Sequence, residues 1–215
     1  ARGHSYRILR AVKNRFGATN EIGVFEMSEA GLQEVGNPSA LFLGDRSRES
    51  AGSAVVATME GTRPILVEVQ ALVGSGSYGN AQRVTSGVDR QRLSLLLTVL
   101  EKRAGLPLTG EDVFVNIPGG IPVHEPAVDL AIVAAVASSL RNQPVPPGVA
   151  VFGEVGLAGE VRGITQPGLR VREAAQMGFT RCVMPAGSQS VDVSAPGCEI
   201  FGVDTVGQAL DGLFA

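Results

Sequence analysis

Cysteine and tryptophan are scarce in this chain. Tryptophan is absent, and Cys182 and Cys198 are the two cysteines in 215 residues, with no CxxC spacing between them. Structural zinc sites usually draw on closely spaced cysteine pairs, so this spacing argues against a metal site within the chain. We therefore expect two buried thiols in a protein of the reducing cytoplasm.

Long hydrophobic runs are missing as well. No apolar stretch approaches the roughly 20 residues that a membrane-spanning helix needs, and the first residues do not resemble a signal peptide. Apolar residues still make up 44% of the sequence, which is enough for a sizeable core. The length suits one large domain, or one domain with part of another, and we expect no contact with a membrane.

The sequence is rich in glycine but has no phosphate-binding motif. A GxxxxGK[ST] run is absent. The glycine-rich stretch 74–87 contains Gly74, Gly76, Tyr78 and Arg83, but it lacks the Lys-Ser/Thr pair that would make it specific for phosphate. We predict a flexible loop there and expect no cofactor bound within the chain.

The net charge of −3 conceals two basic blocks in an acidic background. Residues 1–20 contain five basic and no acidic residues, and residues 81–103 contain five basic against two acidic residues. Such blocks could form an anion-binding surface. A solvated surface balanced by neighbouring carboxylates explains the same counts equally well, so charge alone leaves both alternatives open.

The stretch 112–140 organises the chain. Val113, Val115 and Ile117 occupy alternate positions, as in a half-buried strand. A loop rich in glycine and proline follows, and from Ala127 the sequence is apolar almost all round, which predicts a buried helix. Because helix N-terminal N–H groups stabilise an oxyanion, such a junction is a common place for a nucleophile.

This junction resembles the proteolytic domain of the Lon family. The Lon loop reads roughly PxGxxPKDGPSAG with the serine as nucleophile; here two prolines and a glycine match, while Ala127 occupies the serine position. A second Lon motif, TGExxLxGxV, corresponds to residues 152–161, and the lysine base then falls on Arg170. Alanine has no nucleophilic atom and arginine stays protonated, so the resemblance implies a peptidase fold without the Ser–Lys dyad.

Residues 4–27, HSYRILRAVKNRFGATNEIGVFEM, resemble the RadA (Sms) family of bacterial DNA-repair proteins. The family signature KNRFG consists of Lys13, Asn14, Arg15, Phe16 and Gly17. The resemblance implies a missing N-terminal part that holds a zinc finger with Zn²⁺ and a RecA-like ATPase with ATP and Mg²⁺. It also implies that Lys13 and Arg15 reach ATP bound by a neighbouring subunit, or link ATP binding to DNA binding.

Domain boundaries follow from these motifs. Residues 1–36, with two expected strands, are assigned to the end of the RecA-like ATPase core. Residues 37–51 read as a linker, although the apolar run 40–43 could instead pack against its own domain. Residues 52–215 are assigned to the Lon-like domain, which opens with a hairpin.

The remaining pattern predicts short, intermixed strands and helices. Asp89 is the expected N-cap of a helix with a leucine stripe, and Asp204 or Thr205 that of the last helix. Further strands are expected at 148–152, 182–184 and 199–203, a hairpin at 153–161 and a helix at 167–177. Since no regular βαβ repeat is visible, we predict the α+β class, and the Lon resemblance implies the ribosomal protein S5 domain 2-like fold.

Arg83, Arg90 and Arg92 are the candidates for contacts with DNA. Arg90 and Arg92 occupy the first turn of a predicted helix, where a cation opposes the helix dipole, which favours a functional reason for them. Tyr78 is the one aromatic nearby, so we expect contacts with phosphates rather than with bases. A solvated helix end is the structural alternative.

Three further polar residues, His124, Glu125 and Asp129, surround the vacated nucleophile position. A new hydrolase or a metal site could use them, but capping and structural pairing are the simpler interpretation. For Arg15, the structural alternative is an ion pair with Glu21 or Glu26.

Together the two resemblances imply the C-terminal part of a DNA-dependent ATPase that drives branch migration of recombination intermediates. This part would form a homo-hexameric scaffold that contacts single-stranded and branched DNA, with the recombinase RecA as a candidate further partner. A pure assembly module without DNA contact is one rival. A peptidase with a relocated dyad, drawn from Ser138, Ser139 and Lys102, is the other.

Overall fold

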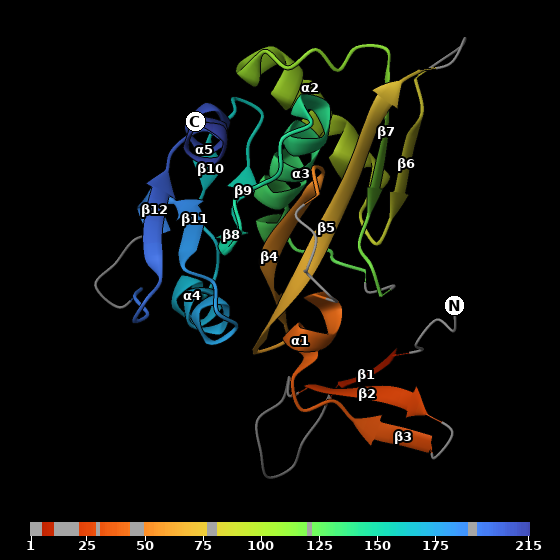
Figure 1. The fold of residues 1–215 in the computed structure, drawn as a ribbon, viewed down its shortest axis with the longest axis vertical. Coiled ribbons are helices and arrows are strands. Elements are labelled where there is room, and N and C mark those ends of the chain that lie inside the picture. The colour runs from red at the N-terminus through yellow and green to blue at the C-terminus, as the bar shows by residue number, and fades with distance from the viewer. Residues whose placement is uncertain are drawn as a thin grey trace.

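The computed structural model describes residues 6–10, 22–28, 31–43, 50–76, 81–119, 122–188 and 193–215. A mixed seven-stranded sheet dominates the fold (Figure 1). Its strands are β4 (Ser53–Glu60), β5 (Arg63–Ser75), β6 (Arg83–Ser86), β7 (Glu111–Asn116), β8 (Val149–Val151), β11 (Arg181–Pro185) and β12 (Glu199–Val203). Their order is β12-β11-β8-β4-β5-β7-β6, with β5 antiparallel to both of its neighbours, β4 and β7, and all other neighbours parallel. The α+β prediction fits this mixed sheet.

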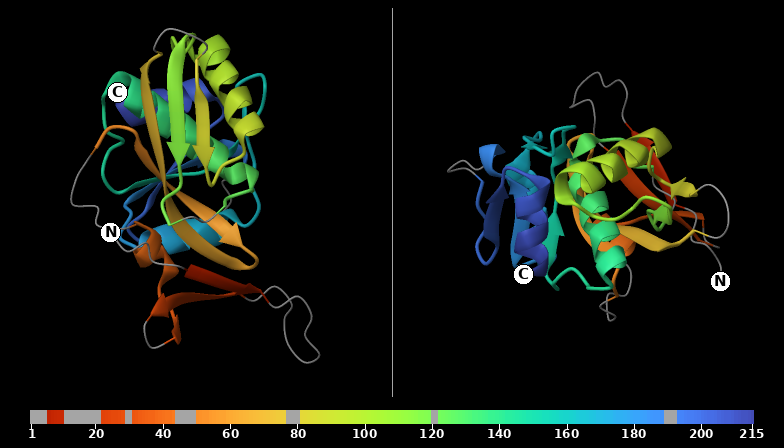
Figure 2. Two further views of the ribbon diagram at one scale, coloured as in Figure 1. Left: turned by 90° about the vertical axis from the view of Figure 1, so that its right-hand side faces the viewer. Right: turned by 90° about the horizontal axis from the view of Figure 1, so that it is seen from above.

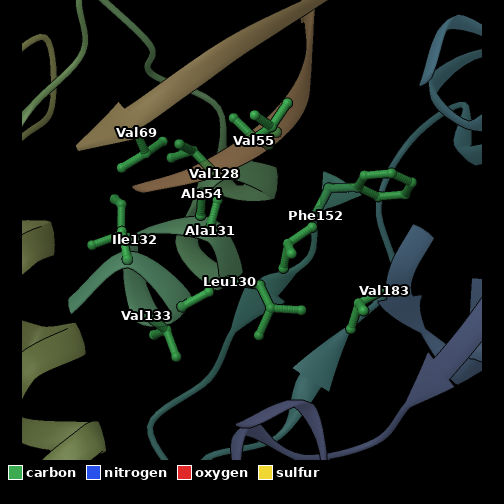
Figure 3. Close-up of a cluster of buried hydrophobic side chains, with 14 of the residues drawn as sticks. Ala54, Val55, Val69, Val128, Leu130, Ala131, Ile132, Val133, Phe152 and Val183 are labelled. Atoms are coloured by element: carbon green, nitrogen blue, oxygen red, sulfur yellow. The ribbon is translucent and has the colours of Figure 1, made fainter. Parts of the chain in front are cut away.

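The helix α3 (Asp129–Arg141) lies at the centre of the fold, as its uniformly apolar sequence predicts. Every residue from Asp129 to Ser138 is buried, and the helix contacts β4 and β5 on the sheet as well as α2 (Arg90–Ala104) and α5 (Val206–Phe214). Figure 3 shows Leu130, Ile132 and Val133 among valines of the sheet. Packing on several sides explains why the helix has no polar face.

The predicted helix caps and the hairpin that opens the Lon-like domain are confirmed. The Asp89 side chain accepts a hydrogen bond from Arg92 N at 2.7 Å, and Thr205 accepts one from Gln208 N at 3.2 Å. Gly61, with φ of 62°, turns β4 into β5. The small hairpin is also present as β9 (Glu154–Val155) and β10 (Val161–Arg162), and the predicted 167–177 helix as α4 (Pro167–Gln176). None of the described helices is long and apolar enough to cross a membrane.

The stretch 74–87 is not a loop throughout. Gly74 and Ser75 end β5, and Arg83–Ser86 forms β6, which pairs in parallel with β7, so the loop prediction is wrong for these six residues. A strand of four residues is too short for its alternation to be recognised in a sequence. It forms because it pairs with β7. Tyr78 lies outside the described residues.

Three antiparallel strands form a separate small sheet: β1 (Tyr6–Arg10), β2 (Ile22–Ser28) and β3 (Gly31–Glu34). The two strands expected within 1–36 correspond to β2 and β3. The strand β1 was not expected, because its closely placed cations conceal the alternation; pairing with β2 stabilises it. Whether these strands are the end of a RecA-like core stays a prediction.

The region assigned to a linker contains the short helix α1 (Pro38–Leu43), so the alternative that it packs against its own domain is the one observed. Phe42 and Leu43 are buried. The buried Ser39 hydroxyl accepts a hydrogen bond from Leu66 N at 3.0 Å and donates one to Glu173 at 2.5 Å. The helix therefore joins β5 to α4 rather than spanning open solvent.

The end of α3 is fastened to the sheet at Gly52, which generates a stability prediction. Gly52 N donates to the Ser138 hydroxyl at 2.9 Å, its φ is 91°, and a Cβ there would lie 2.2 Å from the Ala71 carbonyl oxygen. Gly52→Ala should lower the free energy of unfolding by about 2–5 kcal/mol, because strain and a backbone clash add. Gly178→Ala is the matched control: φ is also positive but the space is open, so about 1–2 kcal/mol is expected in denaturant titrations. Equal losses would contradict the clash.

Candidate functional site

The vacated nucleophile position lies at the start of α3. A single 3-10 turn, η1 (Pro126–Val128), precedes the helix, and Ala127 within it is 2% exposed. Its methyl group is buried where the Lon motif places a hydroxyl. A nucleophile at this position would require another residue type, since no atom of alanine can attack a carbonyl.

Three backbone N–H groups at this helix start are already occupied. Val128 N donates to the Glu125 carbonyl at 3.3 Å, Asp129 N donates to the Pro126 carbonyl, and Leu130 N donates to the Gly153 carbonyl at 3.1 Å. An oxyanion hole needs donors directed at a vacant position. These three donors are directed at carbonyl oxygens of the protein itself.

Arg170, at the position of the Lon lysine, is fully buried in α4 and bound on all sides. Its Nη1 and Nη2 atoms donate to the two carboxylate oxygens of Glu125, each at 2.7 Å. Its Nη1 also donates to the Ala57 carbonyl at 2.6 Å, and its Nε donates to the Thr165 carbonyl at 2.9 Å. These four hydrogen bonds satisfy nearly all the N–H groups of the guanidinium. A lysine, with three N–H groups on one nitrogen, could not bind the same acceptors.

Glu125 completes this closed arrangement. Besides Arg170, its carboxylate accepts a hydrogen bond from Met59 N at 2.7 Å, so it joins the loop before α3 to the strand β4. The expectation of structural pairing at Glu125 is confirmed. Its partner was not predicted, because 45 residues separate the two side chains and the sequence contains no local signal for the contact.

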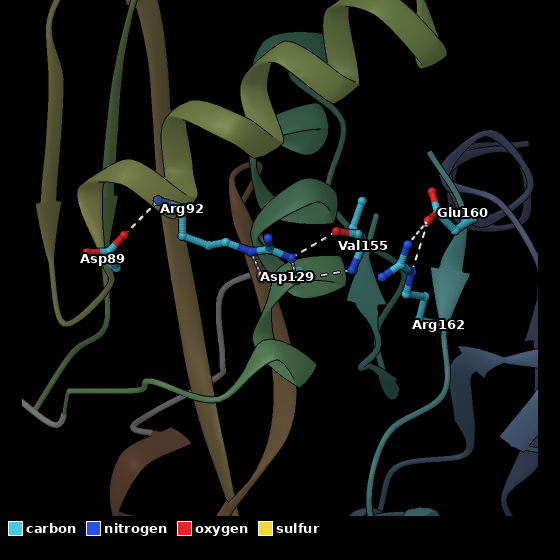
Figure 4. A network of polar contacts seen from close by, with 6 residues as sticks. All are labelled: Asp89, Arg92, Asp129, Val155, Glu160 and Arg162. Atoms are coloured by element: carbon cyan, nitrogen blue, oxygen red, sulfur yellow. Dashed lines mark hydrogen bonds and ion pairs between the residues drawn. The ribbon is translucent and has the colours of Figure 1, made fainter. Parts of the chain in front are cut away.

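A second buried ion pair lies one helical turn further along. Asp129, which is fully buried, binds the guanidinium of Arg92 through both oxygens, with an Nε–Oδ1 distance of 2.9 Å, and accepts from Val155 N at 3.0 Å (Figure 4). Arg92 also donates to the Val155 carbonyl at 2.8 Å. This pair connects α2, α3 and β9.

The two partners affect each other's protonation. Burial raises the pKa of the Asp129 carboxyl, and the hydrogen bonds from Arg92 and Val155 oppose that increase. The hydrogen bond to Asp129 raises the pKa of Arg92. Removing Arg92 would leave the desolvation of Asp129 unopposed, so this arginine has a structural role whatever else it does.

A cavity of about 290 Å³ remains beside these pairs, lined in part by His124, Glu125, Asp129, Arg92 and Glu154. Two of its carboxylates are neutralised by the arginines described above. Across the described ranges, no group of three or more His, Cys, Asp or Glu residues is placed to hold a metal ion. The arrangement serves to join elements rather than to present reactive groups.

The structure does not bring the three DNA-contact candidates together. Arg83 turns inward, and its guanidinium donates to the carbonyls of Gln82, Glu111 and Leu108. Arg92 binds Asp129, and its side chain is 31% exposed. Arg90, in contrast, is exposed at the start of α2. The KNRFG residues, Lys13 to Gly17, lie outside the described part of the chain.

The serines of the relocated-dyad alternative have structural partners. The Ser138 hydroxyl, fully buried, accepts from Gly52 N and donates to the Gln143 carbonyl at 2.5 Å. The Ser139 hydroxyl accepts from Val73 N at 2.9 Å. Lys102 is exposed in the last turn of α2. The two hydroxyls fasten the end of α3 to the sheet.

The burial of Arg170 predicts a large cost for its removal. Arg170→Leu should lower the free energy of unfolding by about 3–5 kcal/mol, because it leaves Glu125 partly buried without its counter-ion. Arg162→Leu is the matched control, since Arg162 pairs with Glu160 at the surface, where solvent screens the pair and a much smaller loss is expected. Urea titrations of both variants check this; comparable losses would contradict a structural role for the buried pair.

Comparison with known proteins agrees with the two motifs. A family model described as the Lon protease (S16) C-terminal proteolytic domain matches residues 48–195. The chain is 54% identical to DNA repair protein RadA of Halalkalibacterium halodurans, over 98% of the chain and 46% of that relative, and 53% identical to DNA repair protein RadA of Bacillus subtilis, over 97% and 46%. It thus spans about half the length of the curated relatives it matches. The chain therefore belongs to the RadA family, with residues 48–195 belonging to the Lon protease C-terminal domain family.

Proposed function

We propose that this chain is a non-catalytic, Lon-like scaffold within a DNA-dependent ATPase that drives branch migration during DNA repair. The relatives are named DNA repair proteins, and the Lon-like domain makes up most of the chain. In this proposal the domain assembles into a homo-hexamer and contributes to DNA contact.

The observation that carries the proposal is the buried Glu125–Arg170 pair. It fills the place where a Lon peptidase needs a neutral lysine to take a proton from serine. Ala127 supplies no nucleophile, Arg170 supplies no neutral base, and the N–H groups of residues 128–130 are bound to carbonyl oxygens. We infer that the fold is retained for assembly rather than for peptide hydrolysis.

Restoring the missing residues tests this inference. Neither Ala127→Ser nor Ala127→Ser combined with Arg170→Lys should hydrolyse unfolded casein or short peptides, since the oxyanion donors stay bound to carbonyls. The single variant keeps the buried ion pair, so its folding can be verified by urea titration before assay. An active Lon peptidase serves as the positive control. Hydrolysis by the wild-type chain that persists after purification to homogeneity would overturn the proposal.

We assign the DNA contact first to Arg90, the exposed member of the predicted trio. Arg83 and Arg92 already donate to groups of the protein, so they could offer phosphates only their remaining exposed edges. Lys13 and Arg15 are proposed to act on ATP held by a neighbouring subunit, or to link ATP binding to DNA binding.

We further assign ATP, Mg²⁺ and Zn²⁺ to parts of the protein beyond these 215 residues. Single-stranded and branched DNA are the proposed nucleic-acid partners, the recombinase RecA is a proposed protein partner, and the cytoplasm is the proposed location. All four assignments rest on the family, not on a site in this chain.

A second candidate is a pure assembly module without DNA contact. The guanidinium groups of Arg83 and Arg92 favour it, because both donate to groups of the protein and leave Arg90 as the exposed cation among the three predicted. The two candidates differ in a single property, which is DNA affinity that depends on salt.

Salt-dependent DNA binding separates these candidates. If Arg90 contacts a phosphate, Arg90→Ala should reduce the slope of log affinity against log salt by about 0.7–0.9. Lys102→Ala, an exposed cation at the other end of the same helix, should leave the slope unchanged. Fluorescence anisotropy with labelled single-stranded DNA measures both. Absent or salt-insensitive binding by the wild type would favour the pure assembly module.

A further inference from the structure

We propose that copies of this chain join head to tail, with Leu157 of one copy seated in an apolar hollow on the β5–β7–β6 face of the next. This inference deepens the proposed function, because it rests on ring assembly and names the two surfaces that form the contact. Neither surface is part of the vacated peptidase site.

The hollow lies on the sheet face that no helix covers. Leu72, Phe114 and Val84 are cross-strand neighbours on β5, β7 and β6, and their exposed fractions are 63%, 37% and 46%. They border a hollow of about 260 Å³. The left view of Figure 2 shows these strands with nothing in front of them. Three adjacent apolar side chains of this kind mark an interaction surface rather than chance exposure.

The chemistry of the hollow indicates a protein partner. The next row along the three strands is Gln70, Asn116 and Ser86, all uncharged. No arginine or lysine is among the described residues that line the hollow. A surface for nucleic acid would need cations to neutralise phosphates. An apolar row beside amides and a hydroxyl instead suits an apolar side chain with polar neighbours.

Leu157 has the properties expected of the side chain that fills the hollow, and we call it the knob. It is the most exposed large apolar residue described, at 67%, and it sits at the tip of the β9–β10 hairpin. The tip is held rigidly: Gly159 N donates to the Gly156 carbonyl, Ala158 N donates to the Glu160 carboxylate, and Val206 N donates to the Gly159 carbonyl. A backbone that is already held in place loses little conformational freedom on docking, which favours binding.

The charges around the two surfaces are complementary. Arg103 lies beside the knob, since a Cβ on Gly159 would be 3.0 Å from the Arg103 Cβ. Nearby Arg162 pairs with Glu160, whereas Arg103 is an exposed cation of α2. At the hollow, Asp112 is on the same strand face as Phe114, two residues away. If the hollows of two chains faced each other, the Asp112 carboxylates of the two chains would lie close together. Their repulsion disfavours a symmetric contact through this face.

The positions of the two surfaces fit a head-to-tail assembly. Figure 1 places β9 and β10 on the opposite side of α2 and α3 from β6 and β7. Two different patches on opposite sides of one chain produce a heterologous contact, which closes into a ring when the rotation permits. A single knob is a small interface, so closure, in which each copy makes two contacts, is needed for stability.

Disulfide trapping tests the contact in the 215-residue chain. In a Cys182→Ala/Cys198→Ser background, Leu157→Cys combined with Val84→Cys should give a ladder of oxidised species up to the closed ring. Leu157→Cys alone and Val84→Cys alone should stay monomeric on the same non-reducing gel. In a head-to-tail contact, neither residue lies near the same residue of the neighbouring chain. The Cβ atoms must approach within about 4.5 Å to cross-link, so random collision contributes little.

A size measurement by light scattering completes the test. Leu157→Glu should weaken assembly at least about tenfold, while Leu95→Glu, another exposed leucine at 44%, should not. Dimers of Val84→Cys alone would overturn the proposal in favour of a symmetric contact. Wild-type rings without the ladder, and unaffected by Leu157→Glu, would overturn this interface and leave ring assembly standing. A monodisperse wild-type monomer at about 100 times the protein concentration used for the gel would overturn both.

Discussion

A buried guanidinium must find acceptors for its N–H groups, and much of this structure follows from how Arg170 does so. Its donors meet Glu125 in a two-point ion pair and the carbonyls of Ala57 and Thr165. These partners come from the loop before α3, from β4 and from the turn before α4. The pair therefore fixes the positions of three segments that are distant in the sequence. Because a buried charge without its partner is costly, the arrangement is maintained as a unit.

The Arg92–Asp129 pair applies the same principle one turn later. It joins α2 to α3 and reaches β9 through Val155, whose hairpin carries Leu157. Both ion pairs occupy the region where a Lon peptidase would bind and cleave its substrate. Charged groups that would be reactive in an open site are here paired with one another. The pairs connect elements of the fold instead of presenting groups to a substrate. Through Val155, the Arg92–Asp129 pair also binds the hairpin that carries Leu157.

Local sequence patterns predicted most of the elements, and the exceptions have a common cause. The uniformly apolar run of α3 and the capping residues Asp89 and Thr205 carry their information within a few residues, and these predictions are confirmed. The strands β1 and β6 and the helix α1 were missed or left open. Each is short, and each forms because a partner strand or a buried hydroxyl bond to Leu66 stabilises it. Short segments depend on contacts that a local pattern does not contain.

The sequence by itself determined the family, the Lon-like loop and the loss of both dyad residues, because residue identity at a motif position needs no coordinates. Only the tertiary structure decided what replaced the dyad. The partner of Arg170 is 45 residues away, and that of Arg92 is 37 residues away. The same holds for Arg83, whose guanidinium turns toward backbone carbonyls that no sequence pattern marks as acceptors. Side-chain pairing between distant segments depends on how the chain folds back on itself, so a charged residue that looks available in the sequence can be fully occupied in the structure.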